Sequence, residues 1–430
     1  MKDLRFVLQQ QEQSGLVRKI DEPTSHVYEA ARAVYDDQES SLQLLHVPGY
    51  DCRLVAGICS TRQKLASALG VEAGELIRFM KQCVDAPAAC AAAGRAGFQA
   101  NVVENPDLGK ILPLVQFYPR GERRYLTSTI VAAKNAAGGT NWSFHRMMLL
   151  QANRLAVRVV PRHLHAILEN AGGKIPALVF CGVHPAVEIA AATSVEPDVE
   201  ESAVAAAMLG GELGCVDMDG IRVPAHAEVV MQGRFTGELG DEGPFVDLTS
   251  TYDDVRRQPV FEVDRLFLRD GFIYRTILPG GLEHKLLMGL PQEPRLLRII
   301  SNTVPSLVAA VLTSGGCSWL HAVVAIRKRA EGEGRNAGLA ALAAHPSLKR
   351  VIVVDEDIDP LDTREVEWAL ATRLQPDRDV HIIPATKGSS LDPSRNLDDE
   401  TSAKWILDAT LPRSRDRDAF VKVEPPARKL

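Results

Sequence analysis

The sequence predicts an α/β protein of three successive parts: a small N-terminal α/β unit, an antiparallel, barrel-like sheet, and a C-terminal doubly wound α/β unit. Apolar strands alternate with helices over residues 1–105, short β-type runs follow one another over 106–300, and the alternation returns over 318–395. Strand–helix alternation is typical of α/β units, and short strands separated by turns are typical of antiparallel barrels. A linker helix is expected over 301–317 and a charged tail over 396–430.

The N-terminal unit is expected to begin with a helix over residues 3–15, where apolar residues share one face and Gly15 ends the helix. A strand follows in SGLVRKI, then a helix over 26–35, then the strands SLQLLHV and RLVAGIC on either side of a PGYD turn. Thr61 is expected to cap the helix TRQKLASALG, which Gly70 ends.

In the middle part, β-type runs dominate: ILPLVQF, YLTSTIVAAK, RLAVRVV, ALVFCGV, AEVVMQGRF, PVFEVDRLFL and FIYRTIL. In the C-terminal unit the strands WLHAVVAI, LKRVIVVD and DVHIIP alternate with the helices NAGLAALAAH and TREVEWALATRL, which predicts a parallel, doubly wound sheet. The acids of DEDIDP at 355–360 are interpreted as turn formers and helix N-terminal charges, because they lack the spacing and glycine of a calcium loop.

Composition excludes several classes of function. Of the 430 residues 46% are hydrophobic and 24% charged, as in ordinary globular proteins, and the 49 basic and 55 acidic residues form no basic stripe for nucleic acid. No run approaches the roughly twenty apolar residues of a membrane span, and the N-terminus has no apolar signal core. The seven cysteines are odd in number and lack a C-x-x-C pair, so reduced thiols in the cytoplasm are expected.

The richest stretch for chemistry runs over residues 140–167, where polar side chains cluster at the ends of two apolar runs. Asn141 and His163 are candidate ligands for a divalent ion. Arg146 and Arg162 are fixed cations suited to phosphate or carboxylate. The alternative interpretation is an edge hairpin with a solvated polar rim.

The motif TNWSxxR at 140–146, followed by NR and P-x-H, resembles the UbiD family of decarboxylases, which use prenylated flavin mononucleotide (prenylated FMN). The resemblance continues through EGPF at 242–245, ILPGGLEHKLL at 277–287, the segment 351–376 and SLDPS at 390–394. It therefore covers most of the chain. It implies a split β-barrel that binds flavin, and the C-terminal α/β unit is expected to form a homodimer or higher homo-oligomer.

The resemblance implies a metal ion, manganese or magnesium, that holds the cofactor phosphate between Asn141, His163 and Glu201. Glu200 is adjacent to Glu201, so a slip of one residue stays open. Without the resemblance, His163 would be interpreted as a core histidine and Glu201 as a solvated acid at a helix start. A second ion, potassium or sodium, is expected beside the first, held mostly by main-chain carbonyls near these residues: Trp142, Ala192, Ser194 and Val195.

The resemblance assigns the catalytic network to Arg146, Glu242 and Asp247. Arg146 would orient the substrate carboxylate beside Glu242, and Asp247 would protonate the carbon left by carbon dioxide. The family usually has Glu at the last position, and Asp is one methylene shorter. A carboxyl group in an apolar pocket beside another carboxylate is expected to have a raised pKa, as a general acid needs. Alternatively, DEGPF is an acidic turn formed by Gly243 and Pro244.

Other residues are expected around the cofactor. His145 is expected to act only through its neighbours, because strand alternation points it away from Arg146. The expected cofactor contacts, beyond the residues named for the metal and catalysis, are Ser143, Phe144, His145, Arg162, Ser194 and Lys387. Further basic candidates are Arg158, His284 and Lys285.

The resulting prediction is reversible, non-oxidative decarboxylation of an α,β-unsaturated or (hetero)aromatic acid of the furan, pyrrole, indole or cinnamic type. A flavin prenyltransferase is expected to supply the cofactor. One alternative is a plain FMN oxidoreductase, which would need a hydride donor and no metal. Another is a non-catalytic assembly subunit of a carboxylase complex, which the Asp at position 247 keeps open.

Overall fold

The computed structural model describes residues 2–121, 123–423 and 425. The chain divides into two compact units, Met1–Pro291 and Gln292–Leu430. The first unit combines the N-terminal and middle parts of the predicted organisation. Among the described residues, no helix is long and apolar enough to cross a membrane.

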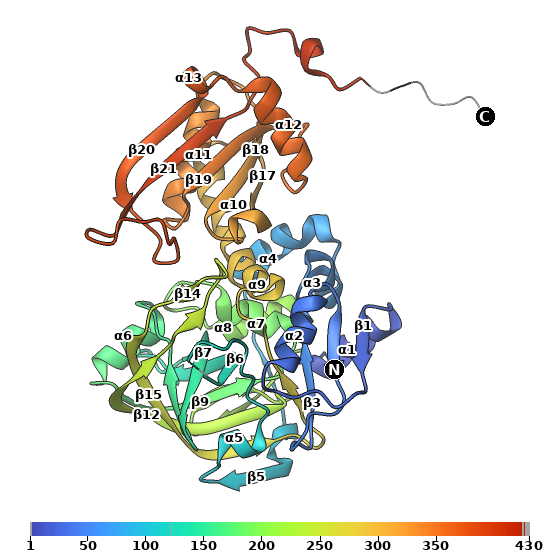
Figure 1. Ribbon diagram of the computed structural model, residues 1–430, viewed down its shortest axis with the longest axis vertical. Coiled ribbons are helices and arrows are strands. Elements are labelled where there is room, and N and C mark those ends of the chain that lie inside the picture. Colours follow the sequence, from blue (N-terminus) through green and yellow to red (C-terminus); the bar gives the residue numbers. More distant parts are fainter. Residues whose placement is uncertain (1, 122, 424, 426–430) are drawn as a thin grey trace, which may run out of the picture. The chain divides into compact units, whose positions relative to one another are not determined.

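The middle part forms a closed barrel, as the short alternating runs predict (Figure 1). In the described chain six antiparallel strands follow the order β12-β9-β6-β7-β8-β15, and β15 pairs again with β12 to close the ring. The strands are β6 (Tyr125–Lys134), β7 (Thr140–Gln151), β8 (Arg154–Val157), β9 (Lys174–Cys181), β12 (Val229–Glu242) and β15 (Arg256–Leu268).

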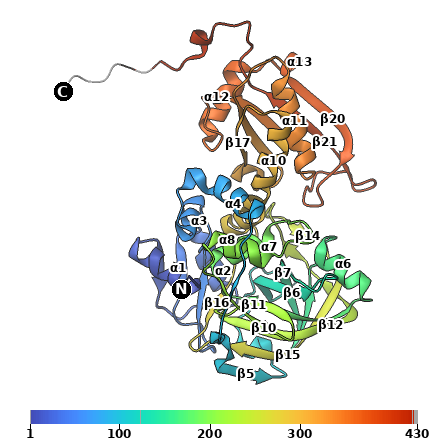
Figure 2. The same cartoon turned by 180° about the vertical axis from the view of Figure 1, so that it is seen from behind.

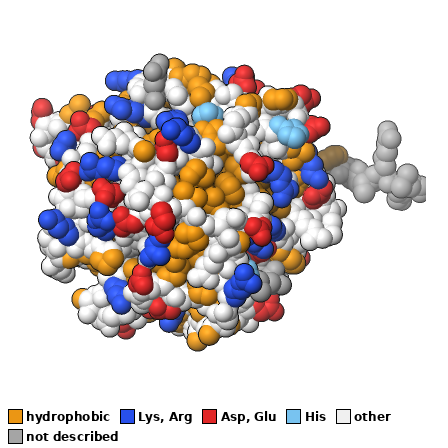
Figure 3. All heavy atoms as spheres, turned by 90° about the horizontal axis from the view of Figure 1, so that it is seen from below, with side chains coloured by type: hydrophobic (Ala, Val, Ile, Leu, Met, Phe, Trp, Pro, Cys, Tyr) orange, Lys and Arg blue, Asp and Glu red, His pale blue; other side chains and the backbone are white. Residues whose placement is uncertain are grey.

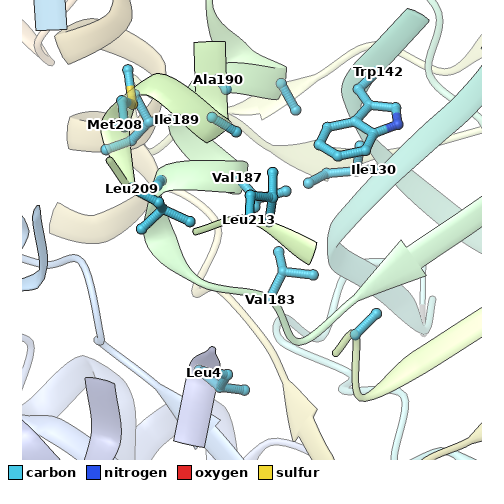
Figure 4. Close-up of a cluster of buried hydrophobic side chains, with 14 of the residues drawn as sticks. Leu4, Ile130, Trp142, Val183, Val187, Ile189, Ala190, Met208, Leu209 and Leu213 are labelled. Carbon is cyan, nitrogen blue, oxygen red and sulfur yellow. The ribbon is translucent and has the colours of Figure 1, made fainter. Parts of the chain in front are cut away.

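Strand β6 is buried on both faces, which explains its nearly continuous apolar sequence. Val131 points into the barrel interior, where Phe235 and Phe261 pack, whereas its neighbour Ile130 joins a second core outside the barrel. Alternate residues of a strand face opposite sides, so one strand serves both cores. Trp142 joins Ile130 in the outer core (Figure 4).

The outer core is covered by helices α7 (Pro185–Ala192) and α8 (Glu201–Met208), which lie against the barrel in both views (Figure 1 and Figure 2). Val187 and Met208 bring their apolar side chains to the same cluster as Trp142 (Figure 4). The short strands β10 (Gly214–Met218), β11 (Ile221–Pro224) and β4 (Ala91–Ala92) form a small sheet beside it.

The N-terminal part contains the predicted elements, and Thr61 caps α3 by accepting the N–H of Lys64 over 3.2 Å. Gly70 ends that helix in the left-handed conformation, with φ of 72°. The elements are α1 (Leu4–Gln13), β1 (Val17–Ile20), α2 (Glu29–Asp36), β2 (Ser41–Leu44), β3 (Arg53–Ala56), α3 (Arg62–Leu69) and α4 (Leu76–Asp85).

The expected boundary near residue 105 does not separate two compact units. Strand β5 (Asn101–Glu104) pairs with β15 at the barrel edge, and β16 (Ile273–Arg275) pairs with β3 in the N-terminal sheet. Arg275 is 1% exposed and binds Glu283 of α9 (Leu282–Gly289) over 2.6 Å, so a buried ion pair also anchors this crossing. The Ala- and Gly-rich segment on which the expected boundary was based is a connection within the first unit.

The second unit is a doubly wound sheet, as predicted, and its strands follow the order β17-β18-β19-β21-β20. Helices α10 and α11 pack on one face and α12 on the other. The two edge strands run antiparallel to their neighbours, so the sheet is mixed. The elements are α10 (Glu293–Thr303), β17 (Leu307–Leu312), β18 (His321–Ile326), α11 (Glu333–Ala344), β19 (Arg350–Asp355), α12 (Thr363–Arg373), α13 (Pro376–Asp379), β20 (Val380–Lys387) and β21 (Thr401–Asp408).

Two expectations about this unit are wrong. The linker helix expected over 301–317 is replaced by the end of α10 and the edge strand β17, whose apolar run LVAAVL pairs with β18. The tail expected over 396–430 contains β21, which lies inside the sheet because Ile406 pairs with Val351 of β19. The sequence did not predict this strand because charged residues flank its short apolar run. Residues 424 and 426–430 of the expected tail lie outside the described residues.

Charges of both signs are interspersed on the face seen from below in Figure 3, and hydrophobic side chains gather near its centre. This distribution agrees with the formal net charge of -6. Nucleic-acid binding depends on phosphate neutralisation by clustered cations, and this mixed face offers no continuous cationic track.

Gly233 lies at an irregularity where β12 shifts its register against β15. A Cβ at this position would lie 2.0 Å from the carbonyl oxygen of Glu262, so the two strands could not approach as they do. We expect Gly233→Ala to destabilise the first unit by about 1–3 kcal/mol, measured by urea unfolding. The matched control is Gly214→Ala, whose Cβ would meet its nearest neighbour, Ala93, at 3.5 Å. Equal unfolding midpoints for the two variants would contradict this account.

Candidate active site

Strand β7 carries two clusters of polar side chains, and each cluster takes partners from other elements. The first joins Asn141 of β7, His163 at the start of α6 (His163–Asn170) and Glu201 at the start of α8. Asn141 Nδ2 donates to Glu201 Oε1 over 2.8 Å, and His163 Nδ1 lies 3.9 Å from the same oxygen. The main-chain N–H of Trp142 donates to Glu201 Oε2 over 2.8 Å. Three segments distant in sequence thus meet around one carboxylate.

This first cluster has the properties of a cation site. Asn141 and Glu201 are 5% and 3% exposed, and Asn141 Oδ1 has no hydrogen-bond partner among the described residues. A buried oxygen without a partner is costly, and a hard divalent cation would satisfy it. Burial raises the pKa of Glu201 to about 7, against the hydrogen bonds from Trp142 and Asn141. Amide oxygen, imidazole and carboxylate together suit manganese or magnesium.

The amide of Asn141 is essential to this donor set. In the described part of the chain, no group of three or more His, Cys, Asp or Glu side chains is placed to hold a metal ion. A cation bound by His163 and Glu201 would therefore need the amide of Asn141 as its third donor. Both α6 and α8 begin at the cluster, and the positive ends of helices favour an anion such as phosphate.

The structure distinguishes Glu201 from its neighbour Glu200. Glu200 Oε1 accepts the N–H of Thr140 over 2.7 Å, and its other oxygen pairs with Arg222. That carboxylate is therefore already committed to a strand end and a surface arginine. Glu201, not Glu200, joins Asn141 and His163.

The second cluster is centred on Arg146, which three carboxylates surround. Arg146 Nε and Nη2 donate to the two oxygens of Glu242 over 2.9 and 3.1 Å. Arg146 Nη1 donates to Asp247 Oδ2 over 2.6 Å, and Nη2 lies 3.4 Å from Asp253 Oδ2. The predicted triad of Arg146, Glu242 and Asp247 is therefore brought together, and Asp253 is an addition that the sequence did not suggest.

Local structure explains how the two catalytic candidates reach one guanidinium. Glu242 ends β12, a cis peptide bond joins Gly243 to Pro244, and Asp247 follows the short strand β13 (Phe245–Val246). The turn expected in DEGPF is thus present, and it returns the chain so that both acids face Arg146. The acidic-turn interpretation explains the conformation of this loop. It does not explain why Glu242 and Asp247 both bind the guanidinium of Arg146.

Aromatic side chains enclose this ion cluster. The guanidinium of Arg146 lies 4.0 Å from the ring centroid of Phe245, and Tyr125 donates its hydroxyl to Glu242 Oε1 over 3.2 Å. Glu242 is fully buried. Low polarity around the cluster strengthens the ionic hydrogen bonds and makes a lost partner costly. Tyr125 begins the apolar run of β6, and no sequence pattern singled it out.

The raised pKa expected for Asp247 is wrong. Burial by itself would raise the pKa of this carboxyl group, but His284 and Arg146 together lower it below its ordinary value. The N–H of Leu248 and the 2.6 Å bond from Arg146 Nη1 act in the same direction, because donors stabilise the carboxylate. The sequence revealed the apolar surroundings of Asp247 but not the direct bond to the guanidinium.

His145 is a neutral, bridging side chain. Its Nδ1 lies 2.8 Å from the carbonyl oxygen of Arg158, and its Nε2 lies 2.9 Å from Ser143 Oγ. Burial lowers the pKa of His145 to about 4. It contacts Ser143 and the segment after β8 rather than Arg146, as the alternation of the strand suggested. Phe144 is half-buried and packs against the outer core.

Arginines lie on both sides of this bridge. Arg162 donates to Ser194 Oγ over 3.0 Å, which joins the start of α6 to the loop after α7 that also holds Val195. Arg158 is half-buried, and its pKa is lowered by burial and by the nearby Arg146 and Arg256. Among the described side chains, no ion pair to Arg158 is formed. Arg158 can therefore receive an anion.

The remaining basic candidates are placed differently. His284 of α9 packs edge-on against Phe245, with ring centroids 6.3 Å apart, and its Nδ1 accepts the N–H of Gly280 over 3.0 Å. Lys285 is its half-buried neighbour on the same helix. Lys387 ends β20 in the second unit, where it pairs with Thr401, and is described only within that unit.

Three models of the 3-octaprenyl-4-hydroxybenzoate carboxy-lyase family match successive parts of the chain. The N-terminal domain model matches residues 8–84, the Rift-related domain model matches 91–282, and the C-terminal domain model matches 285–409. The chain belongs to the UbiD family. It is a decarboxylase of that class.

Relatives of this UbiD-family chain include two archaeal proteins named anhydromevalonate phosphate decarboxylase. The one from Methanothermobacter thermautotrophicus is 42% identical over 91% of this chain and 93% of its own length. The one from Methanocaldococcus jannaschii is 43% identical over 87% of this chain and 89% of its own length.

The solved structures give the same family. The UbiD-class enzyme HmfF from Pelotomaculum thermopropionicum, in complex with FMN, is 33% identical, with a TM-score of 0.94 over 99% of this chain and 97% of that one. An evolved dimeric form of the same enzyme, in complex with prenylated FMN, is 32% identical over the same shares, with a TM-score of 0.90. The predicted fold is confirmed by this likeness.

The low pKa of Asp247 makes stability depend on pH. A carboxylate with a depressed pKa stabilises the fold above its unfolded-state pKa of about 3.9, and this contribution is lost as the pH falls through the folded-state value. We expect Asp247→Asn to lower the free energy of unfolding at pH 7 by about 1–3 kcal/mol, measured by urea titration. The difference from wild type should shrink below about pH 4.

The control for this measurement is Asp254→Asn, because the Asp254 side chain is 85% exposed and changes the net charge equally. Its stability should follow that of wild type across the same pH range. A difference for Asp247→Asn that stays constant between pH 7 and pH 3 would contradict the assigned pKa direction.

Proposed function

We propose that this chain decarboxylates anhydromevalonate phosphate with the help of prenylated FMN. The observation that carries the proposal is the Arg146–Glu242–Asp247 cluster, in a chain that is 42% and 43% identical to decarboxylases named for that substrate. Three further archaeal relatives with the same name are 38–41% identical.

The chemistry of that substrate suits the site. Loss of water next to a carboxylate leaves a double bond conjugated with it, so an anhydro acid is an α,β-unsaturated acid. This is the acrylic type of substrate that the sequence motifs suggest. The heteroaromatic and cinnamic acids stay a prediction and serve as competing substrates in the assay.

The proposed cofactor site is the first cluster. Asn141, His163 and Glu201 would hold a manganese or magnesium ion, and that ion would hold the cofactor phosphate near the starts of α6 and α8. Arg158 and Arg162 are near enough to His145 to lower its pKa, and we assign them to the anionic parts of the cofactor. A bound prenylated FMN supplies the electron sink for the bond that breaks. The potassium site at the main chain of Trp142 and Ser194 stays a prediction.

The protein's own groups then orient the acid and move one proton. Arg146 holds the substrate carboxylate, while Glu242 keeps the guanidinium in place through two hydrogen bonds. A substrate carboxylate at Arg146 Nη1 competes with Asp247 for that N–H. Loss of the bond removes one of the influences that lower the pKa of Asp247, and the negative charge of the substrate carboxylate raises that pKa further.

The raised pKa prepares Asp247 to act as the acid. The bond between carbon and carboxylate breaks, carbon dioxide leaves, and the electron pair stays with the carbon. Asp247 then donates a proton to that carbon and regains one from solvent, so the net reaction consumes one proton. The rival oxidoreductase leaves the Asn141, His163 and Glu201 donors without a role, and an assembly subunit would not need an intact Arg146 cluster.

The metal assignment predicts a difference between adjacent glutamates. In protein co-produced with a flavin prenyltransferase and supplied with manganese, Glu201→Gln should weaken metal binding roughly ten-fold or more and release the flavin. Metal content is measured by elemental analysis, and flavin by absorbance and mass spectrometry. Glu200→Gln is the matched control, because that carboxylate binds Thr140 and Arg222 instead. Equal losses in both variants would contradict the assignment.

The function is tested by turnover. Wild-type holoenzyme should release carbon dioxide from anhydromevalonate phosphate faster than from furan, pyrrole, indole or cinnamic acids. Asp247→Asn should keep the flavin but lose roughly 10²–10⁴-fold in rate, because it removes the proton donor. Asp247→Glu should recover part of the rate. Turnover of a heteroaromatic acid alone would overturn the substrate, and full activity of Asp247→Asn would overturn the role of this acid.

We also propose that the chain assembles as a homodimer or higher homo-oligomer through its second unit. Exposed apolar side chains at Val308 of β17 and Ile382 of β20, 48% and 68% exposed, support this. Sedimentation that shows a stable monomer at low concentration would contradict it.

A further inference from the structure

The proposed substrate carries a phosphate at the end opposite its reacting carboxylate, and that dianion needs cations that are not already neutralised. Arg146 and Arg256 do not qualify, because Arg146 binds Glu242 and Asp247, and Arg256 binds Asp253. Two arginines in the loop before β6 do qualify. Among the described residues, no carboxylate pairs with Arg120 or Arg123, and both are exposed.

We propose that Arg120 and Arg123 bind the phosphate of the substrate and so select a phosphorylated acid. This rests on the proposed function and adds the residues that read the substrate's far end. Both arginines line a narrow pocket together with Tyr125 and Phe245. Those two aromatic residues contact the catalytic cluster, Tyr125 through Glu242 and Phe245 through Arg146. The pocket therefore lies beside the catalytic cluster, and its two cations have no carboxylate partner among the described residues.

Ring contacts make the wall between the two ends. Phe245 packs on Tyr125 with centroids 4.8 Å apart, and Tyr118 packs edge-on against Tyr252 at 6.4 Å. The guanidinium of Arg120 lies over the Tyr252 ring, 5.1 Å from its centroid. A short apolar chain can lie along such a wall, while charged groups at its ends face arginines. Stacking on Tyr252 holds the Arg120 guanidinium without neutralising its charge.

Strand alternation selects Arg123 over its neighbour. Arg123 and Tyr125 are two residues apart and line the same pocket, whereas Arg124 is directed to the opposite side, near Gly109. Arg124 therefore gives a matched control: it has the same charge and lies in the same loop, but it faces away from the pocket.

Carboxylates near Arg120 limit where a phosphate can bind. Beyond the narrow pocket lies a wider hollow of ≈ 500 Å³, which Arg120 shares with Asp253 and Asp254. Asp253 is bound by Arg146 and Arg256, and Asp254 is largely exposed and lies 3.9 Å from Arg256. The narrow pocket, at ≈ 20 Å³, is too small to enclose a phosphate, and its described lining has no carboxylate. The phosphate is thus placed at the mouth of the pocket, at the exposed Arg120 and Arg123 and away from Asp254.

The experiment compares the holoenzyme with Arg120→Gln/Arg123→Gln and with Arg124→Gln. Substrates are anhydromevalonate phosphate and the same acid without its phosphate. The double variant should raise KM for the phosphorylated acid by at least about ten-fold, with kcat little changed, because phosphate binding is equal in the ground and transition states. KM for the unphosphorylated acid should not change. Arg120→Lys should retain part of the affinity.

Inorganic phosphate gives an independent readout. It should inhibit wild type competitively against the phosphorylated acid, and this inhibition should weaken about ten-fold or more in the double variant but not in Arg124→Gln. Flavin content should equal that of wild type in all variants, which separates this site from the cofactor phosphate.

The outcomes separate the two proposals. If wild type decarboxylates the phosphorylated acid and the double variant has the same KM, the proposed function stands and the phosphate site is overturned. If KM rises equally for both acids, the arginines do not read the phosphate, and the inference is also overturned. If wild type does not act on the phosphorylated acid at all, the proposed function fails and the phosphate site falls with it.

Discussion

The candidate active site depends on one guanidinium that is held by two carboxylates in an aromatic enclosure. Arg146 comes from the middle of β7, Glu242 from the end of β12, and Asp247 from beyond the cis Gly243–Pro244 turn. None of these segments could place its charge in an apolar setting alone, because an unpaired buried ion is far more costly than a paired one. The barrel closure between β12 and β15 fixes where β12 ends, and so it fixes Glu242 against Arg146.

Strand β7 relates the two halves of the chemistry. It carries Asn141 near its start and Arg146 five positions later, so one strand sets the distance between the proposed cofactor site and the proposed substrate site. That strand is paired on both sides, with β6 and β8, and Trp142 anchors it in the outer core. His145 adds a bridge from β7 to the segment that carries Arg158. A strand paired on both sides holds the two polar clusters at a fixed separation, as the proposed catalysis by orientation requires.

Much of this could be predicted from the sequence, and the failures have physical causes. Alternating apolar patterns predicted the barrel and the doubly wound sheet, and the motif TNWSFHR contains Asn141 and Arg146, the β7 residues of the two polar clusters. The strand β21 was missed because its apolar residues lie between charged flanks and gain their burial only from β19. The prediction of a raised pKa for Asp247 was wrong because the sequence pattern shows that a side chain is buried but does not show which charged groups lie beside it. Tyr125, Asp253, Arg120 and Arg123 carry no sequence signal, because only tertiary structure brings them to the Arg146 cluster or to the pocket beside it.

The fourth strand of the N-terminal sheet, β16, comes from a distant part of the chain. Strand β3 ends at Ala56, but its partner β16 is not reached until Ile273, after the whole barrel has been read. During synthesis, residues 1–100 therefore leave the ribosome with one edge of their sheet unpaired, and at about 5–20 residues per second they wait for seconds for β16 to follow. An unpaired edge is a template for pairing with other chains. The N-terminal sheet, although it is made first, is thus completed only after the barrel, and molecular chaperones that shield nascent chains would act on it for that interval.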